Sequence, residues 1–323
     1  MNNVPDDIKI LQLESFFKLF NILQEFRLLL EYQSDQSLKN YDSASHNLDE
    51  WVKDINEWCQ ANNDSTPVFE YTKSFRCGEV IDLRDSEHYI SLPIGSMETD
   101  IDKKREFLKE ILEQAHQLYL AWCFEKYEAF LKNLYVTIGS IDYTLWSNSD
   151  FKKTENPYDW TKDDFYNRIF SGNKYDAQIL RKRFLGIAPN ITKGEAPHNY
   201  RMTPPVYEEN YLWYIVYITL LRHYIVHTQG KIRDINRFNE KIQTILGLTN
   251  NPELSDFLIS YNNIFLQKEN NGYVISLIEL SHEKPNYRFH VLIQHLINHA
   301  WLICSCTYTE LKRRYSSSIK DGQ

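Results

Sequence analysis

The chain has 323 residues, enough for one large or two modest domains with a buried core. Its net charge of −8 excludes a protein held to nucleic acid by diffuse charge alone. Gly and Pro contribute only 10 residues each, which favours long uninterrupted helices, and an aromatic content of 14% excludes a disordered chain.

Targeting and redox signals are weak. Five cysteines are too few and too unevenly spread for a disulfide framework, so a reducing compartment is expected. The first residues show no secretory signal, and the most apolar run, 211–221, is far shorter than the roughly 20 residues that span a bilayer. We therefore expect a cytoplasmic protein without a membrane partner.

The N-terminal third predicts two helices. Apolar residues in 11–30 recur at three- and four-residue spacing, and a second helix is expected over 48–60. Short strands or irregular structure are expected in 67–94. Together these elements form an N-terminal helical module, residues 1–104, of unknown role.

The longest predicted helix covers 102–137, where no Gly or Pro interrupts the apolar repeat. Its length is typical of the spine of a helical bundle. Residues 142–205 are rich in Asn, Asp, Lys, Tyr and Pro, which predicts an inserted, loop-rich lobe with a short helix at 176–184.

Two further helices and a hairpin complete the predicted bundle. One helix runs from about 207 to 229 and ends at Gly230, a residue suited to the left-handed position that closes helices. The segments 257–267 and 273–279 are expected to form a β-hairpin. The last helix extends to about Arg314, and the tail, 316–323, is expected to be flexible.

The most informative stretch is the end of the helix before Gly230. Arg222 and His227 are five positions apart, so they lie about 140° apart around the helix and can flank one cleft. A guanidinium can donate two hydrogen bonds to a phosphate, and an imidazole moves protons near neutral pH. This pair suits phosphodiester chemistry.

An arginine followed by a polar residue, His223, three more residues and a histidine resembles the signature of the HEPN superfamily, which comprises ribonucleases and nucleotide-binding helical domains. The likeness covers about 102–314 without 142–205, so the expected fold is mainly α, a HEPN-like domain at 105–315 with an insertion at 142–205. The resemblance implies a homodimer with a composite site and no cofactor or metal.

What the resemblance implies is a metal-independent endoribonuclease that leaves a 2′,3′-cyclic phosphate, used as a toxin-like or antiviral defence effector with an antitoxin or regulatory partner. His227 would be the general base, Arg222 would stabilise phosphate charge, and His223 would orient substrate or the catalytic pair. The alternative is a non-catalytic HEPN-like module that binds a nucleotide or partner.

An acidic ribonuclease needs a local concentration of positive charge for RNA. Two groups are candidates for RNA binding: one follows the motif, and the other lies in the inserted lobe, where it could equally be a solvated helix face. They are Lys231, Arg233 and Arg237, and Arg181, Lys182 and Arg183.

A zinc protein is the less favoured alternative. His223 and His227 are four residues apart, as are His295 and His299, and this spacing allows two imidazoles of one helix to share a metal. Cys304 or Cys306 could add a ligand. Neither pair carries the glutamate of the zinc-protease pattern, so we expect no metal and place His295 and His299 on a polar helix face or a dimer seam.

Overall fold

The fold was analysed in a computed structural model. The structure describes the backbone of residues 6–61, 74–75, 80–81, 91–92, 97–98, 101–171, 174–189, 193–194, 209–280 and 285–320. It is mainly helical, as predicted.

The helices are long at both ends of the chain and shorter in the middle. They are α1 (Asp6–Ala61), α2 (Ile101–Ile141), α3 (Lys162–Phe170), α4 (Ala177–Ile187), α5 (Tyr211–Thr228), α6 (Ile235–Leu246), α7 (Pro252–Phe265) and α8 (Phe289–Lys320), with short 3-10 helices η1 (Tyr143–Leu145), η2 (Asn148–Asp150) and η3 (Pro157–Asp159).

The strands are short and antiparallel. β7 (Lys231–Ile232), β9 (Gly272–Ile275) and β8 (Leu266–Glu269) form a three-stranded sheet in that order. The other strands form isolated pairs: β1 (Ser74–Phe75) with β4 (Met97–Glu98), β2 (Val80–Ile81) with β3 (Ser91–Leu92), β5 (Lys193–Gly194) with β6 (Glu209–Asn210), and β10 (Ile278–Leu280) with β11 (Pro285–Tyr287).

The chain divides into two compact units. One comprises Met1–Leu28 and Ala115–Gln323, and the other comprises Leu29–Gln114. The division therefore falls within α1 and α2 and not at the predicted boundary near residue 104. Residues 1–28 are grouped with 115–323 in this division, and a separate module of residues 1–104 stays a prediction.

The first helix is one continuous element where two were predicted. Residues 31–47 lack a clear apolar repeat, which is why the sequence did not predict helix there. The whole range Asp6–Ala61 nevertheless contains no Gly or Pro. Because nothing in the backbone breaks the helix, it continues through this polar stretch.

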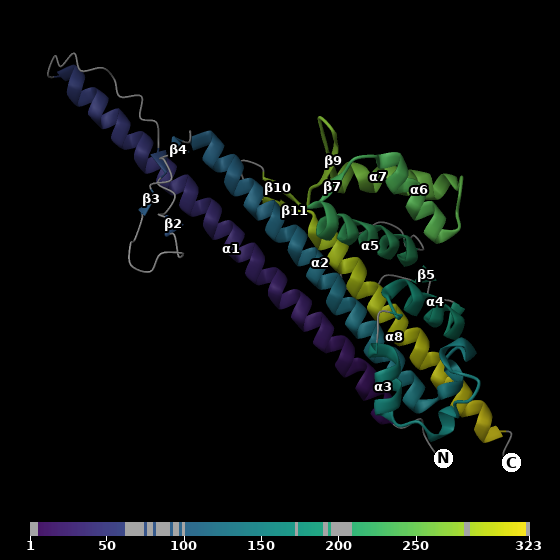
Figure 1. The fold of residues 1–323 in the computed structure, drawn as a ribbon. Coiled ribbons are helices and arrows are strands. Elements are labelled where there is room, and N and C mark those ends of the chain that lie inside the picture. The colour runs from purple at the N-terminus through teal and green to yellow at the C-terminus, as the bar shows by residue number, and fades with distance from the viewer. Residues whose placement is uncertain are drawn as a thin grey trace. The chain divides into compact units, whose positions relative to one another are not determined.

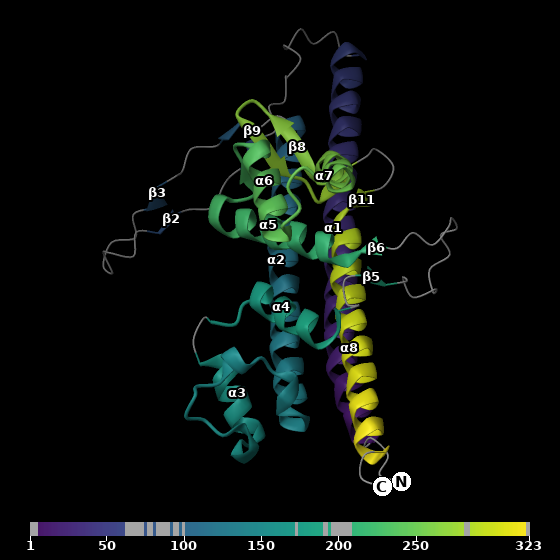
Figure 2. The same cartoon turned by 90° about the vertical axis from the view of Figure 1, so that its right-hand side faces the viewer.

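The core of the larger unit lies among α2, α5 and α8. Figures 1 and 2 show α5 lying across α2 and α8. Periodic apolar residues from all three helices are fully buried at this junction, and the start of α1 adds Phe16, whose ring lies 5.1 Å from that of Trp301. The buried set includes Leu120, Cys123, Leu131, Ile215, Leu221, Leu292, Leu296 and Ala300.

The predicted lobe after α2 is more ordered than a loop. Its Trp146 stacks on Tyr135 of α2 with ring centroids 4.5 Å apart, and its indole donates a hydrogen bond to the Tyr135 carbonyl. Gly139 allows this approach, because a Cβ there would lie 2.6 Å from the Trp146 ring. Asp150 is buried and accepts hydrogen bonds from Tyr135 and Arg183. The short helix predicted at 176–184 is confirmed, because α4 covers Ala177–Ile187.

Two helices between α5 and α8 were missed. α6 begins at the N-cap Asp234 and ends at Gly247, which has φ 67°. Residues 257–265, expected as the first hairpin strand, belong to α7, and the hairpin itself is the shorter β8–β9 pair. α8 extends to Lys320, so 316–320 are helical where a flexible tail was predicted.

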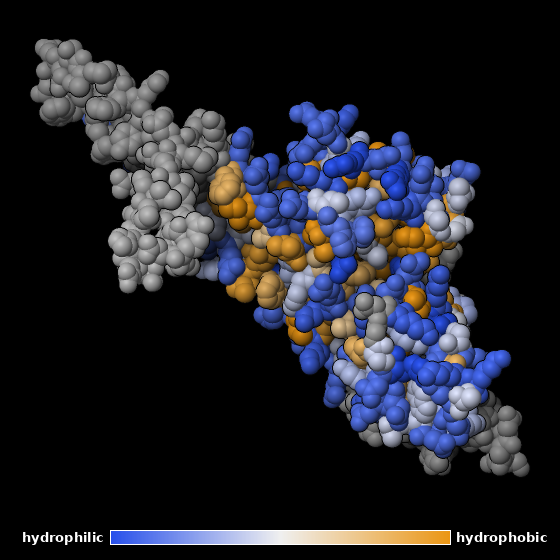
Figure 3. Space-filling view, in the orientation of Figure 1, coloured by the Kyte–Doolittle hydropathy of each residue, from blue (hydrophilic) through white to orange (hydrophobic). Residues whose placement is uncertain are grey.

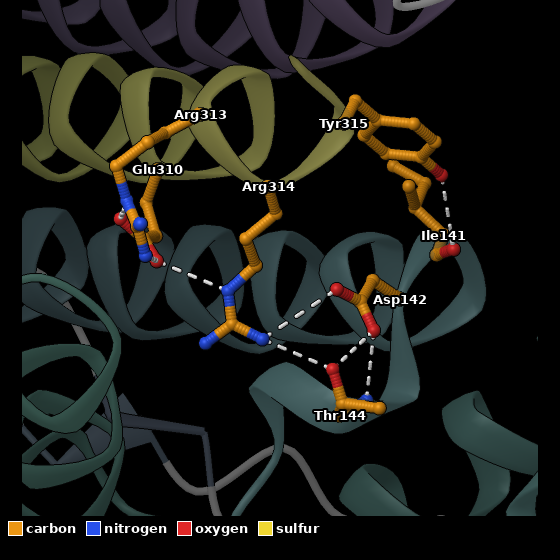
Figure 4. A network of polar contacts seen from close by, with 7 residues as sticks. All are labelled: Ile141, Asp142, Thr144, Glu310, Arg313, Arg314 and Tyr315. Atoms are coloured by element: carbon orange, nitrogen blue, oxygen red, sulfur yellow. Dashed lines mark hydrogen bonds and ion pairs between the residues drawn. The ribbon is translucent and has the colours of Figure 1, made fainter. Parts of the chain in front are cut away.

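Polar contacts join the ends of α2 and α8 (Figure 4). Glu310 accepts hydrogen bonds from Arg313 and Arg314, which lower the pKa of its carboxyl to about 2. Arg314 also donates to Thr144 at 3.0 Å. These contacts fix the C-terminal half of α8 against η1.

Some apolar surface remains exposed. Phe17, Phe26 and Leu118 expose about half or more of their side chains, and Figure 3 shows apolar residues interrupting the polar surface along α2. Single exposed apolar residues are normal on soluble proteins, so these carry no functional assignment.

Candidate functional site

The predicted motif lies at the C-terminal end of α5, whose apolar residues are buried on nearly every side. Ile215, Ile218, Leu221 and Ile225 are at most 5% exposed. At the last two turns the helix presents a different surface, because its outward positions become polar. The motif is therefore carried by a rigid, deeply anchored element, which suits a site that needs fixed geometry.

The motif residues share one exposed arc of α5. His223 and Val226 fall within the 140° between Arg222 and His227. His223 and His227 are both exposed, and their ring centroids are 4.6 Å apart at an interplanar angle of 51°. The structure thus brings the two imidazoles together and places Arg222 at the edge of the same surface.

Arg222 reaches α2. Its Nη2 donates to Glu125 Oε1 at 3.2 Å, and the two side chains are 31% and 60% exposed. Its Nε is buried and has no hydrogen-bond partner. An exposed ion pair of this kind contributes at most about 1 kcal/mol. The guanidinium can therefore exchange Glu125 for a phosphate at small cost and still keep donors free.

The imidazole of His223 lies in a positive environment. Partial burial lowers its pKa, and positive charge on His227, Lys241 and Arg222 lowers it further. The neutral imidazole is therefore the favoured form near neutral pH. In this form a ring nitrogen can accept a proton or a hydrogen bond.

The helix ends as the sequence predicted, with one addition. Gly230 has φ 77°, but Gln229 before it also has a positive φ of 54°. The Gly230 amide donates to the Tyr224 carbonyl at 3.0 Å. A Cβ on Gly230 would lie 2.6 Å from Gln117 Oε1, so glycine allows this turn to pack against α2. The turn locks the motif end in place.

The basic residues after the motif are exposed, as phosphate binding requires. Lys231 lies on β7, Arg233 follows it, and Arg237 lies in the first turn of α6. A fourth cation, Lys241, follows Arg237 by one helical turn, and, after partial burial, its positive charge helps to lower the pKa of His223. It was missed because α6 was missed, although Asp234, a favoured N-cap, and the spacing of Phe238 and Ile242 could have revealed that helix.

The basic group in the inserted lobe is not a solvated cluster. Arg181 is only 5% exposed, and its Nε donates to the Ala177 carbonyl. Arg183 Nη2 pairs with buried Asp150 at 2.8 Å, and only Lys182 is exposed. Burial leaves Arg181 little surface for the predicted RNA contact, and Arg183 is paired within the lobe core. They face inward because α4 packs these positions against the interior.

The second histidine pair is buried. His295 approaches the Tyr261 hydroxyl at 2.8 Å, and His299 Nδ1 lies 2.6 Å from the Tyr127 hydroxyl. Burial lowers the pKa of both imidazoles to about 3, with a further contribution from Arg181 at His299. They are polar core residues, where a polar helix face or dimer seam was expected. Within the described residues no group of three or more His, Cys, Asp or Glu could hold a metal ion.

Cys123 is fully buried in α2, and burial raises the pKa of its thiol to about 12. It is an inert core residue, as expected.

Comparison with known proteins found no matching family model, curated sequence or solved structure. Among the described helices, none is long and apolar enough to cross a membrane.

Proposed function

We propose that this protein is a metal-independent endoribonuclease whose reacting groups are Arg222 and His227. The observation that carries the proposal is the exposed arc on α5, where an arginine and two histidines converge at the end of a helix that is otherwise buried. A titratable base beside a phosphate-binding guanidinium is the minimum that RNA cleavage by the neighbouring 2′-hydroxyl needs.

In the proposed reaction His227 takes the proton from the ribose 2′-hydroxyl. The 2′-oxygen attacks the adjacent phosphorus, the bond from phosphorus to the 5′-oxygen breaks, and an acid returns a proton to that oxygen. The products are a 2′,3′-cyclic phosphate and a 5′-hydroxyl. Arg222 stabilises the charge on the phosphoryl oxygens, and His223 orients the substrate.

The acid in this reaction is assigned to His227 of a second copy of the chain. One chain offers one motif arginine and one motif base on this arc. Val226, which lies among the motif residues, is 47% exposed, and an apolar side chain in that place supports contact with another copy of α5. A composite dimeric site would follow from pairing the two arcs. A toxin-like or antiviral role, held in check by a partner protein, rests on the HEPN resemblance.

The test is cleavage of single-stranded RNA by the purified protein in EDTA. Arg222→Ala and His227→Ala should each reduce the rate by at least about 100-fold, while circular dichroism shows the fold retained. His46→Ala, on the exposed surface of α1, is the matched control. Cleavage by both site variants at the wild-type rate would overturn the site assignment, and loss of cleavage in EDTA would overturn metal independence.

Product and assembly analysis sharpen the same test. The 3′ ends should resist polyadenylation until the cyclic phosphate has been opened and the resulting monophosphate removed to leave a free 3′-hydroxyl. His227→Ala added in excess should inhibit the wild-type protein, because a mixed dimer holds only one of the two His227 side chains that the reaction uses as base and acid. A strictly monomeric active enzyme would contradict the composite site.

A further inference from the structure

Lys241 of α6 is held beside the motif. Phe238 and Ile242 are fully buried on the inner face of α6, and the Phe238 ring lies 5.7 Å from that of Tyr224 on α5. On the same side the Lys241 ammonium lies 5.6 Å from the centre of the Tyr224 ring. The packing of α6 therefore fixes Lys241 beside Tyr224, the residue that follows His223 on α5.

His223 lies beside cationic side chains from two helices. Partial burial lowers its pKa, and positive charge on His227 and Arg222 of α5 and on Lys241 of α6 lowers it further. Its ring centroid is 5.7 Å from that of Tyr224, over which Lys241 lies. Arg222 has Glu125 as a counterion, but no ion pair of Lys241 is formed within the parts of the chain that the structure describes. In a chain with a net charge of −8, a partly exposed lysine without an ion pair beside two histidines is a local concentration of positive charge.

The chemistry of this group fits a phosphate. Lys241 supplies a point charge, and His223 can donate a hydrogen bond once an anion favours its protonated form. Tyr224, which is partly exposed beneath Lys241, adds an aromatic surface. Cations combined with an aromatic side chain are typical of sites that follow the backbone of a single-stranded nucleic acid.

We propose that Lys241 and His223, which both lie beside the Tyr224 ring, form a subsite for a backbone phosphate of single-stranded RNA, built across α5 and α6 next to His227. The proposal rests on the proposed function in taking RNA as the ligand. Lys241 binds and positions the substrate and takes no part in proton transfer, so it determines how tightly RNA binds before the reaction.

Binding can be measured without cleavage by using a fluorescent 2′-O-methyl oligoribonucleotide, which has no free 2′-hydroxyl to react. Fluorescence anisotropy gives its Kd at several salt concentrations. We expect Lys241→Gln to raise Kd about fivefold, as for loss of one exposed charged contact. The slope of log Kd against log salt should fall by about 0.7, the value for one phosphate contact on a single strand.

Two variants control this measurement. Lys241→Arg keeps the charge and should bind within about twofold of wild type. Lys162→Gln removes one positive charge from an exposed position on α3 and should leave both Kd and the salt slope unchanged. A histidine NMR titration adds a third readout, because inorganic phosphate should raise the pKa of His223 less in Lys241→Gln than in wild type.

The outcomes separate this proposal from the proposed function. If Lys241→Gln binds the oligonucleotide with the wild-type Kd and salt slope, the subsite is overturned, even if the protein cleaves RNA. If binding depends on Lys241 but unmodified RNA stays intact, the subsite stands and the nuclease assignment fails. If the protein cleaves RNA, Lys241→Gln should raise KM about fivefold with kcat within twofold, and a fall in kcat alone would contradict a binding role.

Discussion

Two clusters in this protein combine an arginine with histidine, and their surroundings give them different properties. On α5, Arg222, His223 and His227 are at least partly exposed, and Arg222 forms an ion pair with the carboxylate of Glu125. In the interior, burial lowers the pKa of His299 on α8, the positive charge of Arg181 on α4 lowers it further, and His299 contacts the Tyr127 hydroxyl. The first cluster can exchange partners with a ligand, whereas the second has its geometry fixed by packing.

The two histidine pairs make the same point. His223 and His227 have the same four-residue spacing as His295 and His299, yet only the first pair is open to solvent. Burial lowers the pKa of both inner imidazoles to about 3, which removes them from proton transfer near neutral pH. The ability of a histidine pair to transfer protons near neutral pH therefore depends on its exposure and not on its spacing in the sequence. Four predictions test this contrast.

The largest effect is expected from His299→Ala, which should lower the free energy of unfolding by about 3 kcal/mol. The change leaves a cavity and deprives the buried Tyr127 hydroxyl of its partner. Urea unfolding followed by circular dichroism measures the loss. His227→Ala, on the exposed side of α5, should change stability by less than about 0.5 kcal/mol. Equal losses in the two variants would remove the contrast.

Acid should destabilise the inner cluster. The pKa values of His295 and His299 are about 3 in the folded protein, against an ordinary value of 6.5. Between these values the unfolded chain binds protons that the folded chain does not. Stability contributed by the neutral imidazoles is complete above about pH 6.5 and falls towards pH 3 by roughly 1.4 kcal/mol per pH unit for each histidine.

This dependence can be isolated by comparing the wild type with His299→Phe in urea unfolding at pH 7, 6 and 5. The variant should lose less stability over this range than the wild type, because one of the two titrating groups is gone. Parallel curves would show that His299 is as accessible to protons in the folded protein as in the unfolded one.

Arg181→Met should raise the free energy of unfolding by about 1 kcal/mol. Burial lowers the pKa of this guanidinium, and its Nη1 has no hydrogen-bond partner. Replacing a buried, poorly paired charge by an apolar side chain of similar length is commonly neutral or stabilising. Thermal unfolding beside the exposed control Lys182→Met measures the change. A clear fall in the free energy of unfolding would contradict this prediction, because it would mean that interactions of the Arg181 guanidinium outweigh the cost of burying its charge.

The smallest effect is expected from Glu125→Gln, which removes the counterion of Arg222. Because both side chains are partly exposed, stability should change by about 0.5 kcal/mol or less. If RNA competes with Glu125 for the guanidinium, the same variant should bind 2′-O-methyl RNA slightly more tightly. Weaker binding would show that Glu125 holds Arg222 in its binding geometry.

Much of the fold could be predicted from apolar spacing. The repeat at 102–137 and the break at Gly230 correspond to α2 and the end of α5. The two failures have different causes. α1 continues through the polar 31–47, where apolar spacing is weak, whereas α6 was missed although its Asp234 cap and the spacing of Phe238 and Ile242 are typical of a helix.

The candidate site could be predicted only as far as residue types and one helix allow. Arg222, His223 and His227 are local to α5, so helical geometry alone placed them on one arc. Lys241 and Glu125 come from α6 and α2, and nothing in the local sequence shows that they reach α5. For the same reason the sequence could not separate buried Arg181 from exposed Lys182, its neighbour.

The sequence by itself determined the long helices and the motif at the end of α5, because both follow from interactions between residues within about one turn of each other. The tertiary structure decided which polar groups face water. That choice depends on packing between α2, α4, α5 and α8, segments far apart in the chain, and burial is what makes His299 a neutral core residue. Exposure leaves His223 and His227 free to meet a ligand.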